Sequence, residues 1–599
     1  MCGITGYVGD GDALEIVAST LANLEYRGYD SAGVALGNDD LSISKAAGRI
    51  GDLTLPDASG ATCGIGHTRW STHGPPTDAN AHPHTDCTGE IAVVHNGIIE
   101  NHAALKAELE GEHTFTSETD TEVVPHMIED EWDGGDLMEA VSAVVERLSG
   151  SYAIAVTVAG RDEIVAARQD SPLVVGHGDG ETFLASDVPA FVEHSRDVTF
   201  LEDGDVARIT PEGVEIRHDG EPVERARTQV EWEAEAAEKG GYEHYMLKEI
   251  HEQPRALRQA LTGRVDALSG DVDLDVDLPA EYLQSLDEIQ IVAAGTSYHA
   301  GLYAKELFER LADVRVTTHV ASEYEVQGGR DPWQTLVVAI TQSGETADTL
   351  EALRKAAATG AKTLAVTNTV GSTVTREADE TVYIHAGPEI GVAATKTFVS
   401  QVATVTMLAV ALGRHRGALG REEAGEVLSS LRDLPGAIQQ VLDREREIEA
   451  IAEEYADRSA FFFLGRQFGY PVALEGALKL KEISYDHAEG FAAGELKHGP
   501  LALVTDDVLV LSVLTEGANP EATLHNVAEV DTRGAATVGF GKVEGDQSVL
   551  DAAFPVPDAG LLEPVVANVY MQLFAYHVAR LKGRAIDKPR NLAKSVTVQ

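Results

Sequence analysis

The chain has 599 residues and a mass of 63.8 kDa, which is long enough for about four domains. Its 98 Asp and Glu residues outnumber 46 Lys and Arg residues, so the formal net charge is −52 and the pI is near 4.6. Such a negative field excludes nucleic acids and anionic membranes as partners over a broad surface. Because salt screens this self-repulsion, the composition indicates a salt-adapted, halophilic cytoplasm.

The cysteine content also favours a reducing cytoplasm. Cys2, Cys63 and Cys87 are too few for a disulfide framework and have no C-x-x-C spacing. The chain opens on CGITGYVGD without a basic and apolar leader, and its most continuous apolar stretch, 402–412, is too short to span a membrane. We expect Cys63 and Cys87 to occupy structural positions.

The first third of the chain, residues 2–217, is predicted to be an α+β domain with antiparallel sheets. Its short β-rich runs are 61–66, 91–95, 152–158, 164–167, 173–176, 182–185 and 206–209. Helical patterns occupy 12–24, 101–110 and 136–148. The charged and Asp-rich stretch 218–279 follows, and we expect it to be a linker.

Cys2 becomes the first residue once Met1 is removed. A terminal cysteine carries both a thiol and a free α-amine, whose usual pKa of about 7.7–8.0 suits a general base. One residue can then supply both the nucleophile and the base without a histidine. A cysteine at position 2 is by itself weak support for a catalytic role, and the motifs around it provide the stronger argument.

That context resembles the class II glutamine amidotransferase domain of the N-terminal-nucleophile family. The motifs, in order, are CGITGYVG (2–9), EYRGYDSAG (25–33), GHTRWSTHG (66–74), NAHPH (80–84), VVHNGIIEN (93–101) and SETDTE (117–122). The resemblance implies that Cys2 attacks the glutamine carboxamide and that Asn96 and Gly97 form the oxyanion hole. The glutamine-binding residues that it implies are Arg69, Thr72, His73 and Asp120. It also implies that Trp70 gates an ammonia channel.

The histidines of this region do not predict a metal site. His67, His73, His82 and His84 fit no standard zinc spacing. We therefore expect no metal in the chain.

The remaining chain contains an internal repeat. One copy begins at Ile289 and the other at Ala460, and Gly295 and Gly465 are equivalent turn glycines. In each copy an apolar strand, a turn and a helix are followed by the same three elements. Continuously apolar strands that alternate with helices predict a parallel sheet covered on both faces. We expect two doubly wound α/β domains, at 280–420 and 450–589, with ligands at the carboxyl ends of their strands.

Two turns of the first copy suit an anionic ligand in a protein without a basic patch. AAGTSYH (293–299) and TQSGET (341–346) each follow a strand and open a helix, and they offer hydroxyl, amide and backbone N–H donors. The chain has neither G-x-x-x-x-G-K-[ST] nor G-x-G-x-x-G, so we expect no nucleotide cofactor.

The two repeats resemble SIS (sugar isomerase) domains. The order of amidotransferase, linker, SIS and SIS resembles the glutamine–fructose-6-phosphate aminotransferase (isomerizing) family over essentially the whole chain. The most specific stretches are 387–398, 473–503 and 587–599. Three positions depart from the usual pattern, namely Thr341, Ala394 and Ala294, and Ala394 puts any contact from that position in doubt.

This second resemblance implies the residues of the sugar site. Lys594, in an active-site tail at 590–599, would form a Schiff base with the sugar carbonyl. Glu482 would move a proton between C1 and C2 with help from Lys479, and His498 would open the sugar ring. The phosphate would be held by Ser297, Thr341, Gln342, Ser343 and Thr346.

The expected activity is conversion of D-fructose 6-phosphate and L-glutamine to D-glucosamine 6-phosphate and L-glutamate, at the start of amino-sugar synthesis. No pyridoxal phosphate, metal or nucleotide is expected, and the resemblance implies a homodimer through the SIS domains. One alternative is an amidotransferase that acts on another keto-sugar phosphate. Another is a sugar-phosphate-binding SIS regulator, which would need none of Cys2, Glu482, His498 and Lys594.

Overall fold

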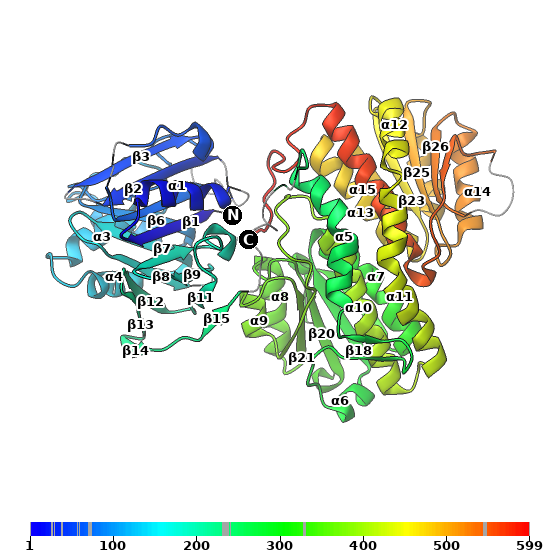
Figure 1. The fold of residues 1–599 in the computed structure, drawn as a ribbon, viewed down its shortest axis with the longest axis horizontal. Helices are drawn as coiled ribbons and strands as arrows, with labels where there is room; N and C mark the ends of the chain where they lie inside the picture. Colours follow the sequence, from blue (N-terminus) through cyan, green and yellow to red (C-terminus); the bar gives the residue numbers. More distant parts are fainter. Residues whose placement is uncertain are drawn as a thin grey trace. The chain divides into compact units, whose positions relative to one another are not determined.

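The computed structural model describes residues 2–25, 28, 30–37, 40–56, 58, 60–69, 75–169, 171–230, 239, 241–326, 331–542 and 548–597. The chain divides into two compact units (Figure 1). The first unit comprises Met1–Glu238 and Ala593–Gln599, and the second comprises Lys239–Leu592.

The first unit contains two antiparallel sheets. One has the order β15-β11-β9-β10-β1-β4-β2-β3 and the other β14-β13-β12-β8-β7-β6-β5. The strands of the first sheet are β1 (Gly3–Gly9), β2 (Ser31–Gly37), β3 (Leu41–Ala47), β4 (Cys63–Arg69), β9 (Val174–His177), β10 (Glu181–Ala185), β11 (Asp197–Phe200) and β15 (Arg227–Gln229). Those of the second are β5 (His84–Thr85), β6 (Ile91–Ile99), β7 (Gly150–Val158), β8 (Ile164–Gln169), β12 (Asp205–Thr210), β13 (Gly213–His218) and β14 (Glu221–Val223).

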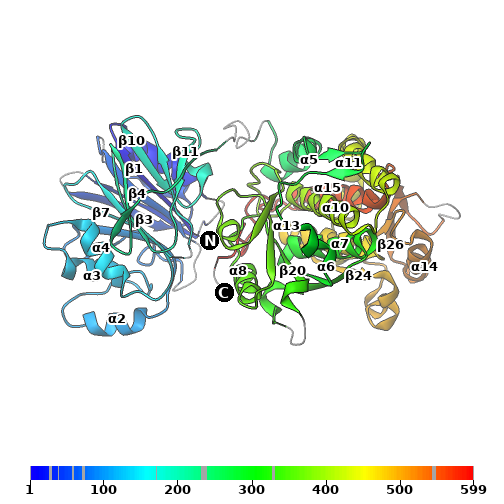
Figure 2. The ribbon, with the colours of Figure 1, turned by 90° about the horizontal axis from the view of Figure 1, so that it is seen from below.

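The two sheets of this unit pack face to face, with helices on their outer faces. The helices are α1 (Ala13–Asn23), α2 (His102–Leu109), α3 (Val123–Glu131) and α4 (Leu137–Val145). Along β6, Ala92 and Val94 belong to the core between the sheets, whereas Ile91 and Val93 belong to the core beneath α2, α3 and α4. A strand that is buried on both faces is apolar at every position, which explains the run IAVV. Figures 1 and 2 show α3 and α4 beside the sheet that contains β7.

Glycine lets α1 approach the first sheet closely. A Cβ at Gly66 of β4 would lie 2.9 Å from Cγ1 of Val17 and 3.2 Å from Cδ2 of Leu21, both in α1. The same strand ends in Arg69, so this packing helps to fix the strand that carries a predicted glutamine-binding residue.

The second unit contains two parallel five-stranded sheets with the same strand order. They are β19-β18-β20-β21-β22 and β24-β23-β25-β26-β27. The first sheet has β18 (Glu288–Ala293), β19 (Arg315–Val320), β20 (Thr335–Ile340), β21 (Lys362–Thr367) and β22 (Glu380–Tyr383). The second has β23 (Ala460–Gly465), β24 (His487–Ala492), β25 (Val508–Leu514), β26 (Ala536–Gly541) and β27 (Ala552–Phe554). The short pair β16 (Val265–Asp266) and β17 (Asp271–Val272) is antiparallel.

Helices connect the strands and pack the two repeats together. They are α5 (Tyr245–Leu261), α6 (Ala280–Ser285), α7 (Gly295–Ala312), α8 (Ala347–Ala357), α9 (Thr373–Glu377), α10 (Lys396–Arg416), α11 (Arg421–Leu442), α12 (Glu445–Tyr455), α13 (Gly469–Ser484), α14 (Pro520–Asp531) and α15 (Glu563–Leu581). One continuous apolar core includes residues of both sheets and of α7, α10, α11, α13 and α15, which Figures 1 and 2 show between the sheets.

α10 contains the most continuous apolar stretch of the sequence, and α5 lies in the expected linker. α10 is long and apolar enough to cross a membrane, but 89% of its most apolar window is buried within the unit. α5 lies within the stretch expected as a linker, and its residues Met246, Ile250 and Leu257 belong to the core of the second unit.

The fold class expected from the sequence is confirmed in both units. Among the elements that the structure adds to those expected in the first unit are β1, β2, β3, β11, β13 and α3. β1 (GITGYVG) and β2 (SAGVALG) are rich in glycine, which disfavours strands when judged locally. Both are buried along their whole length, and pairing with neighbouring strands stabilises them.

Candidate functional site

In the first unit, strand pairing brings Cys2 to the end of β4. β1 and β4 are antiparallel with Gly3 opposite Thr68, so Cys2 at the start of β1 lies beside Arg69. Burial lowers the pKa of Arg69, and the acidic groups of Cys2, Asp120 and Asp30 oppose this effect. The buried guanidinium therefore lies among groups of opposite charge, which favour its charged form.

The Asn96 side chain has a defined orientation. Nε2 of His67 lies 2.9 Å from the carbonyl oxygen of His95, so it carries the proton and also donates to Oδ1 of Asn96 at 3.1 Å. The amide nitrogen of Asn96 therefore faces the other way, and it donates to the Cys2 carbonyl at 3.1 Å and to Ser186 Oγ at 2.8 Å. Burial first, and then Arg69, lowers the pKa of His67 to about 3, so this ring is neutral and acts as a fixed donor.

The next residue, Gly97, cannot carry a side chain without rearrangement. Its φ is +120°, and a Cβ there would lie 2.0 Å from the carbonyl oxygen of Ser151. Two residues further on, the Ile99 N–H donates to Oδ2 of buried Asp120 at 2.8 Å. The end of β6 thus positions Asn96, Gly97 and Asp120 together. Trp70, Thr72 and His73 lie outside the described residues.

In the second unit, the predicted phosphate-binding residues gather at the carboxyl ends of β18 and β20. Thr341 directly follows β20, and its Oγ1 accepts from the Gly344 N–H at 3.2 Å and lies 3.5 Å from Oγ1 of Thr346. Gly344 has φ +72°, and a Cβ there would lie 2.1 Å from Ser372 Oγ. The turn ends at the first residue of α8, so the partial positive charge of that helix faces the same place.

The neighbouring turn places Ser297 in the first turn of α7. Its Oγ accepts from Nε2 of Gln401 in α10 at 2.9 Å. Ser343 and Gln342 are partly exposed in the β20 turn, where Ser343 Oγ accepts from the Glu345 N–H at 3.2 Å. Hydroxyl, amide and backbone N–H donors therefore lie at the carboxyl ends of β18 and β20, as expected from the sequence.

A buried ion cluster joins α13 of the second repeat to the start of α7 in the first. Nζ of Lys479 lies 2.6 Å from Glu482 and 3.3 Å from Glu475, and it donates to Thr296 Oγ1 at 3.0 Å. Glu475 also contacts Nδ1 of His299 at 2.7 Å. Burial alone would lower the pKa of Lys479, but the two carboxylates hold it above its ordinary range.

This cluster brings Glu482 and Lys479 to the turn that carries Ser297, because Thr296 is the adjacent residue. The other predicted residues lie elsewhere. His498 is exposed at the end of a short 3-10 helix (Ala493–His498), and Lys594 belongs to the compact set of the first unit.

The equivalent turn of the second repeat is closed by its own carboxylate. After β25, the Glu516 N–H donates to Oε2 of Glu563 at 2.8 Å. Burial raises the pKa of Glu563. The hydrogen bond from the Glu516 N–H opposes this shift, and nearby acidic groups add to it. The Glu563 carboxylate therefore contacts the backbone of the turn that corresponds to the Gln342–Ser343 turn of the first repeat.

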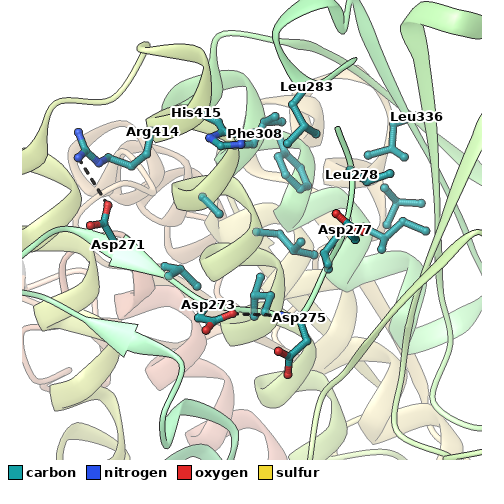
Figure 3. Close-up of a pocket in the computed structure, with 18 residues that line it drawn as sticks. Asp271, Asp273, Asp275, Asp277, Leu278, Leu283, Phe308, Leu336, Arg414 and His415 are labelled. Atoms are coloured by element: carbon teal, nitrogen blue, oxygen red, sulfur yellow. Dashed lines mark hydrogen bonds and ion pairs between the residues drawn. The ribbon is translucent and has the colours of Figure 1, made fainter. Parts of the chain in front are cut away.

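A cavity of about 560 Å³ lies at the opposite end of the first sheet (Figure 3). Its lining includes Leu336 and Leu364 near the amino ends of their strands, and His415 and Arg414 at the end of α10. Arg414 pairs with Asp271 at 3.5 Å. The cavity is apart from the donor-rich turns, so it is not the predicted sugar site.

Several residues of these clusters were missed by sequence reasoning. Glu475 lies four positions before Lys479 on the same helix, and this spacing was a usable signal. Thr296, His299 and Gln401 had no local signal, because their partners lie 104 or more positions away. The same holds for Ser186, which is 90 positions from Asn96.

The two units together define an amidotransferase joined to paired sugar-isomerase-type domains. A glutamine amidotransferase domain family matches residues 67–193, and the SIS domain family matches residues 282–411 and 454–581. Relatives named glutamine–fructose-6-phosphate aminotransferase (isomerizing) are 63% identical in Halobacterium salinarum and 49% identical in Thermus thermophilus, over the full length of both chains. The chain belongs to this aminotransferase family.

A solved structure agrees for the second unit. The C-terminal domain of glucosamine-fructose-6-phosphate aminotransferase from Francisella tularensis has a TM-score of 0.55 and 37% identity, and it covers 59% of this chain and 99% of that one. The halobacterial relative is consistent with the salt adaptation inferred from the net charge.

Proposed function

We propose that this chain converts D-fructose 6-phosphate and L-glutamine to D-glucosamine 6-phosphate and L-glutamate. The observation that carries the proposal is the buried cluster that joins Lys479 and Glu482 to Thr296, next to the donor-rich turns. An acid/base pair beside a neutral anion site suits isomerisation of a sugar phosphate. The family of the chain names the same reaction.

The glutaminase step is assigned to the first unit. Cys2, with Met1 removed, attacks the carboxamide carbon of glutamine, and its own α-amine takes the thiol proton. The Asn96 amide and the Gly97 N–H donate to the oxyanion that forms. Arg69 pairs with the α-carboxylate of glutamine and Asp120 with its α-ammonium, as the family resemblance implies. Ammonia leaves, and water then hydrolyses the γ-glutamyl thioester to glutamate.

The remaining residues of the glutamine site keep the roles that the family resemblance gives them. Thr72 and His73 line the glutamine pocket, and Trp70 gates the route of ammonia to the sugar.

The sugar step is assigned to the second unit and the C-terminal tail. Ser297, Thr341, Gln342, Ser343 and Thr346 hold the phosphate with hydroxyl, amide and backbone donors. His498 opens the ring, and the Lys594 amine condenses with the C2 carbonyl and releases water. Ammonia then displaces Lys594 at C2.

Glu482 completes the isomerisation by moving a proton from C1 to C2. Because Lys479 lies 2.6 Å from Glu482, it holds that carboxylate in place and stabilises its charge. Both residues come from α13, so the second repeat supplies the acid/base groups.

The direct test follows product from two nitrogen sources. Fructose 6-phosphate is incubated with the protein and either glutamine or ammonium in molar KCl, and glucosamine 6-phosphate is measured by mass spectrometry. We expect product with both sources. If neither source gives product, the synthase assignment is wrong and a sugar-phosphate regulator becomes the better reading.

We also propose that the protein acts in the cytoplasm as a homodimer formed through the SIS domains. The exposure of His498 and of Leu503, whose side chain is 59% exposed on the next 3-10 turn, supports a partner surface there. Light scattering after size-exclusion chromatography in molar KCl should give twice the mass of one chain.

A further inference from the structure

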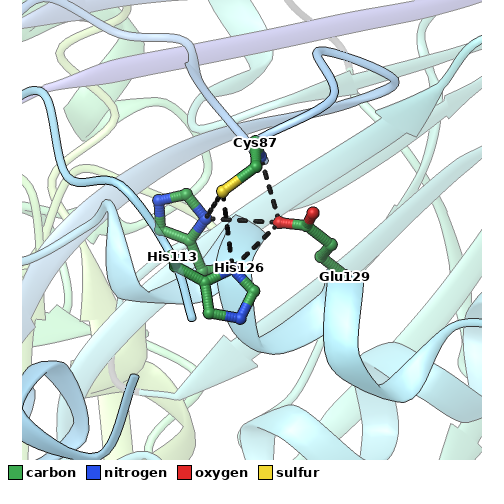
Figure 4. Close-up of side chains that lie close together, drawn as sticks. All are labelled: Cys87, His113, His126 and Glu129. Carbon is green, nitrogen blue, oxygen red and sulfur yellow. Dashed lines mark hydrogen bonds and ion pairs between the residues drawn. The ribbon is translucent and has the colours of Figure 1, made fainter. Parts of the chain in front are cut away.

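Four side chains of the first unit point toward one another away from the predicted glutamine site (Figure 4). They are Cys87, His113, His126 and Glu129, and their potential ligand atoms all lie within 4.8 Å of one another. Cys87 lies in the turn between β5 and β6, His113 follows α2, and the other two lie on α3. Three separate segments therefore meet at this cluster.

Four of the six distances between the potential ligand atoms match a tetrahedral metal ion, and all six are within 4.8 Å. Sγ of Cys87 lies 3.5 Å from Nδ1 of His113 and 3.6 Å from Nδ1 of His126. Oε2 of Glu129 lies 3.1 Å and 3.4 Å from the same two nitrogens. Zinc bond lengths of about 2.3 Å to sulfur and about 2.0–2.1 Å to nitrogen or oxygen set S···N at about 3.5 Å and N···O at about 3.3 Å.

Both ring nitrogens of His113 face carboxylates. Nε2 lies 3.0 Å from Oδ1 of Asp130, outside the cluster. Nδ1 faces Oε2 of Glu129 inside the cluster, at 3.1 Å, a separation that one bound metal ion can bridge. The bond to Asp130 is also the carboxylate–histidine contact that orients metal-bound imidazoles.

The environments of His126 and Cys87 also favour a bound cation. The His126 side chain is 1% exposed, and its Nε2 has no hydrogen-bond partner among the described residues while Nδ1 faces the cluster. Sγ of Cys87 faces Nδ1 of both histidines. A divalent cation at the centre of the cluster would give these side chains a shared partner.

We propose that Cys87, His113, His126 and Glu129 bind one Zn²⁺ ion. One thiolate, one carboxylate and two neutral imidazoles balance the charge of a divalent ion, and the mixed S, N and O donors suit Zn²⁺ rather than the all-oxygen sites of Mg²⁺ or Ca²⁺. The thiol of Cys87 releases its proton to solvent when the Zn–S bond forms. The site replaces the expectation of a chain without metal and gives Cys87 a role.

The ion would brace the predicted glutamine pocket, an effect that rests on the proposed function. His113 and His126 flank the segment 117–122, which contains Asp120. A metal that joins the two histidines closes this segment into a short loop and limits its motion. All four ligands are required, and no position stays open for substrate, so the site is structural.

Metal content tests the site without reference to activity. The full-length chain is prepared without a polyhistidine tag, incubated with excess Zn²⁺ in molar KCl, desalted and analysed by mass spectrometry for bound metal. We expect about one zinc per chain. With Co²⁺ in place of zinc, we expect a thiolate-to-metal absorption band that disappears in Cys87→Ala. A chain that retains no zinc overturns the proposal.

Matched variants locate the ion. Competition with a chromophoric chelator should show zinc affinity at least about tenfold weaker in Cys87→Ala and Glu129→Gln. The controls are Cys63→Ala, which removes a thiol elsewhere in the unit, and Glu131→Gln, which changes an exposed carboxylate on the same helix. Equal affinities in variants and controls would place the ion elsewhere.

A chelator tests the bracing effect. Zinc removal should lower the Tm of the unmodified chain and raise its KM for glutamine, and it should leave ammonium-dependent synthesis unchanged. An unchanged Tm and KM would overturn the bracing effect. If the chain makes no product at all, the zinc content still decides the metal site, so the two proposals fail separately.

Discussion

The orientation of the Asn96 amide, the proposed oxyanion donor beside Cys2, is set by His67. Neutral His67 holds Oδ1 of Asn96, and this contact turns the amide nitrogen toward Cys2. The low pKa of His67, about 3, means that its donor role does not change across physiological pH. The proposed oxyanion hole is therefore set before glutamine arrives.

Asn96→Ala removes one oxyanion donor. We expect kcat for glutamine hydrolysis to fall by about 10²–10³-fold with little change in KM, because the donor acts on the transition state. Asn101→Ala is the control, since that amide donates to the Arg147 carbonyl at 2.8 Å outside the pocket. A glutaminase assay on both variants checks the result, and equal activities would remove Asn96 from the mechanism.

Cys2→Ala should abolish synthesis from glutamine and spare synthesis from ammonium. Lys594→Ala should stop both, because the sugar carbonyl then has no amine partner. Cys63→Ala serves as the thiol control, since burial raises the pKa of Cys63 to about 12 and keeps it inert. Product formation from each nitrogen source distinguishes the variants, and the reverse pattern would contradict both roles.

Helix α13 contains a buried lysine that neutralises a fully buried carboxylate on the same helix. Lys479 and Glu475 are both fully buried, and Lys479→Met would leave the carboxylate of Glu475 without that cation. We expect a loss of about 3–5 kcal/mol in the free energy of unfolding. Lys481→Met, on the exposed side of the helix, should change it by less than about 0.5 kcal/mol. Urea unfolding in molar KCl measures both, and similar losses would contradict the assignment.

Helix α12 is tied to its neighbours through Glu445, which lies 2.8 Å from His251 of α5 and 3.1 Å from His577 of α15. These bonds lower the pKa of Glu445 to about 2, so the carboxylate stabilises the fold fully above the unfolded value of about 4.3. That contribution is lost as the pH falls from about 4.3 toward 2.

Glu445→Gln should therefore reduce stability at pH 6 and have a shrinking effect below about pH 4. The check is the difference in urea midpoint between the variant and the unmodified chain at several pH values. A difference that stays constant down to pH 3 would show that the ionised form is not what stabilises this junction.

Much of the element pattern follows from the sequence, because it depends on local periodicity. The repeat at Ile289 and Ala460 predicted both parallel sheets, and the turn residues predicted where the donors gather. Long-range contacts were not accessible in the same way. The Gly-rich strand β1 and the contacts of Thr296 and Ser186 depend on partners far along the chain.

The cluster around Cys87 could not be predicted from the sequence for the same reason. Its histidines are 13 residues apart and its cysteine is 26 residues before the first of them, which fits no common metal motif. Only the packing of the β5–β6 turn, the segment after α2 and helix α3 brings them together. Pattern reasoning therefore predicted sites whose residues fall in motifs, and it did not predict this cluster, which tertiary structure assembles.

At the scale of the whole molecule, the net charge of −52 sets the solvent that the protein needs. The screening length is about 10 Å at 0.1 M salt and about 3 Å at 1 M, so repulsion between surface carboxylates fades over this range. We expect Tm to rise steeply between 0.1 M and 2 M KCl. A non-ionic osmolyte such as sucrose at matched water activity is the control, and an equal rise there would contradict screening as the cause.

The contact between Glu563 and the turn after β25 distinguishes the two copies of the repeat. The turn after β20 carries hydroxyl and amide donors, whereas the Glu516 N–H of the turn after β25 donates to the Glu563 carboxylate. Under the proposed mechanism the copies are complementary, because the first would bind the phosphate and α13 of the second would supply the acid/base groups. A single copy would then lack part of the sugar site.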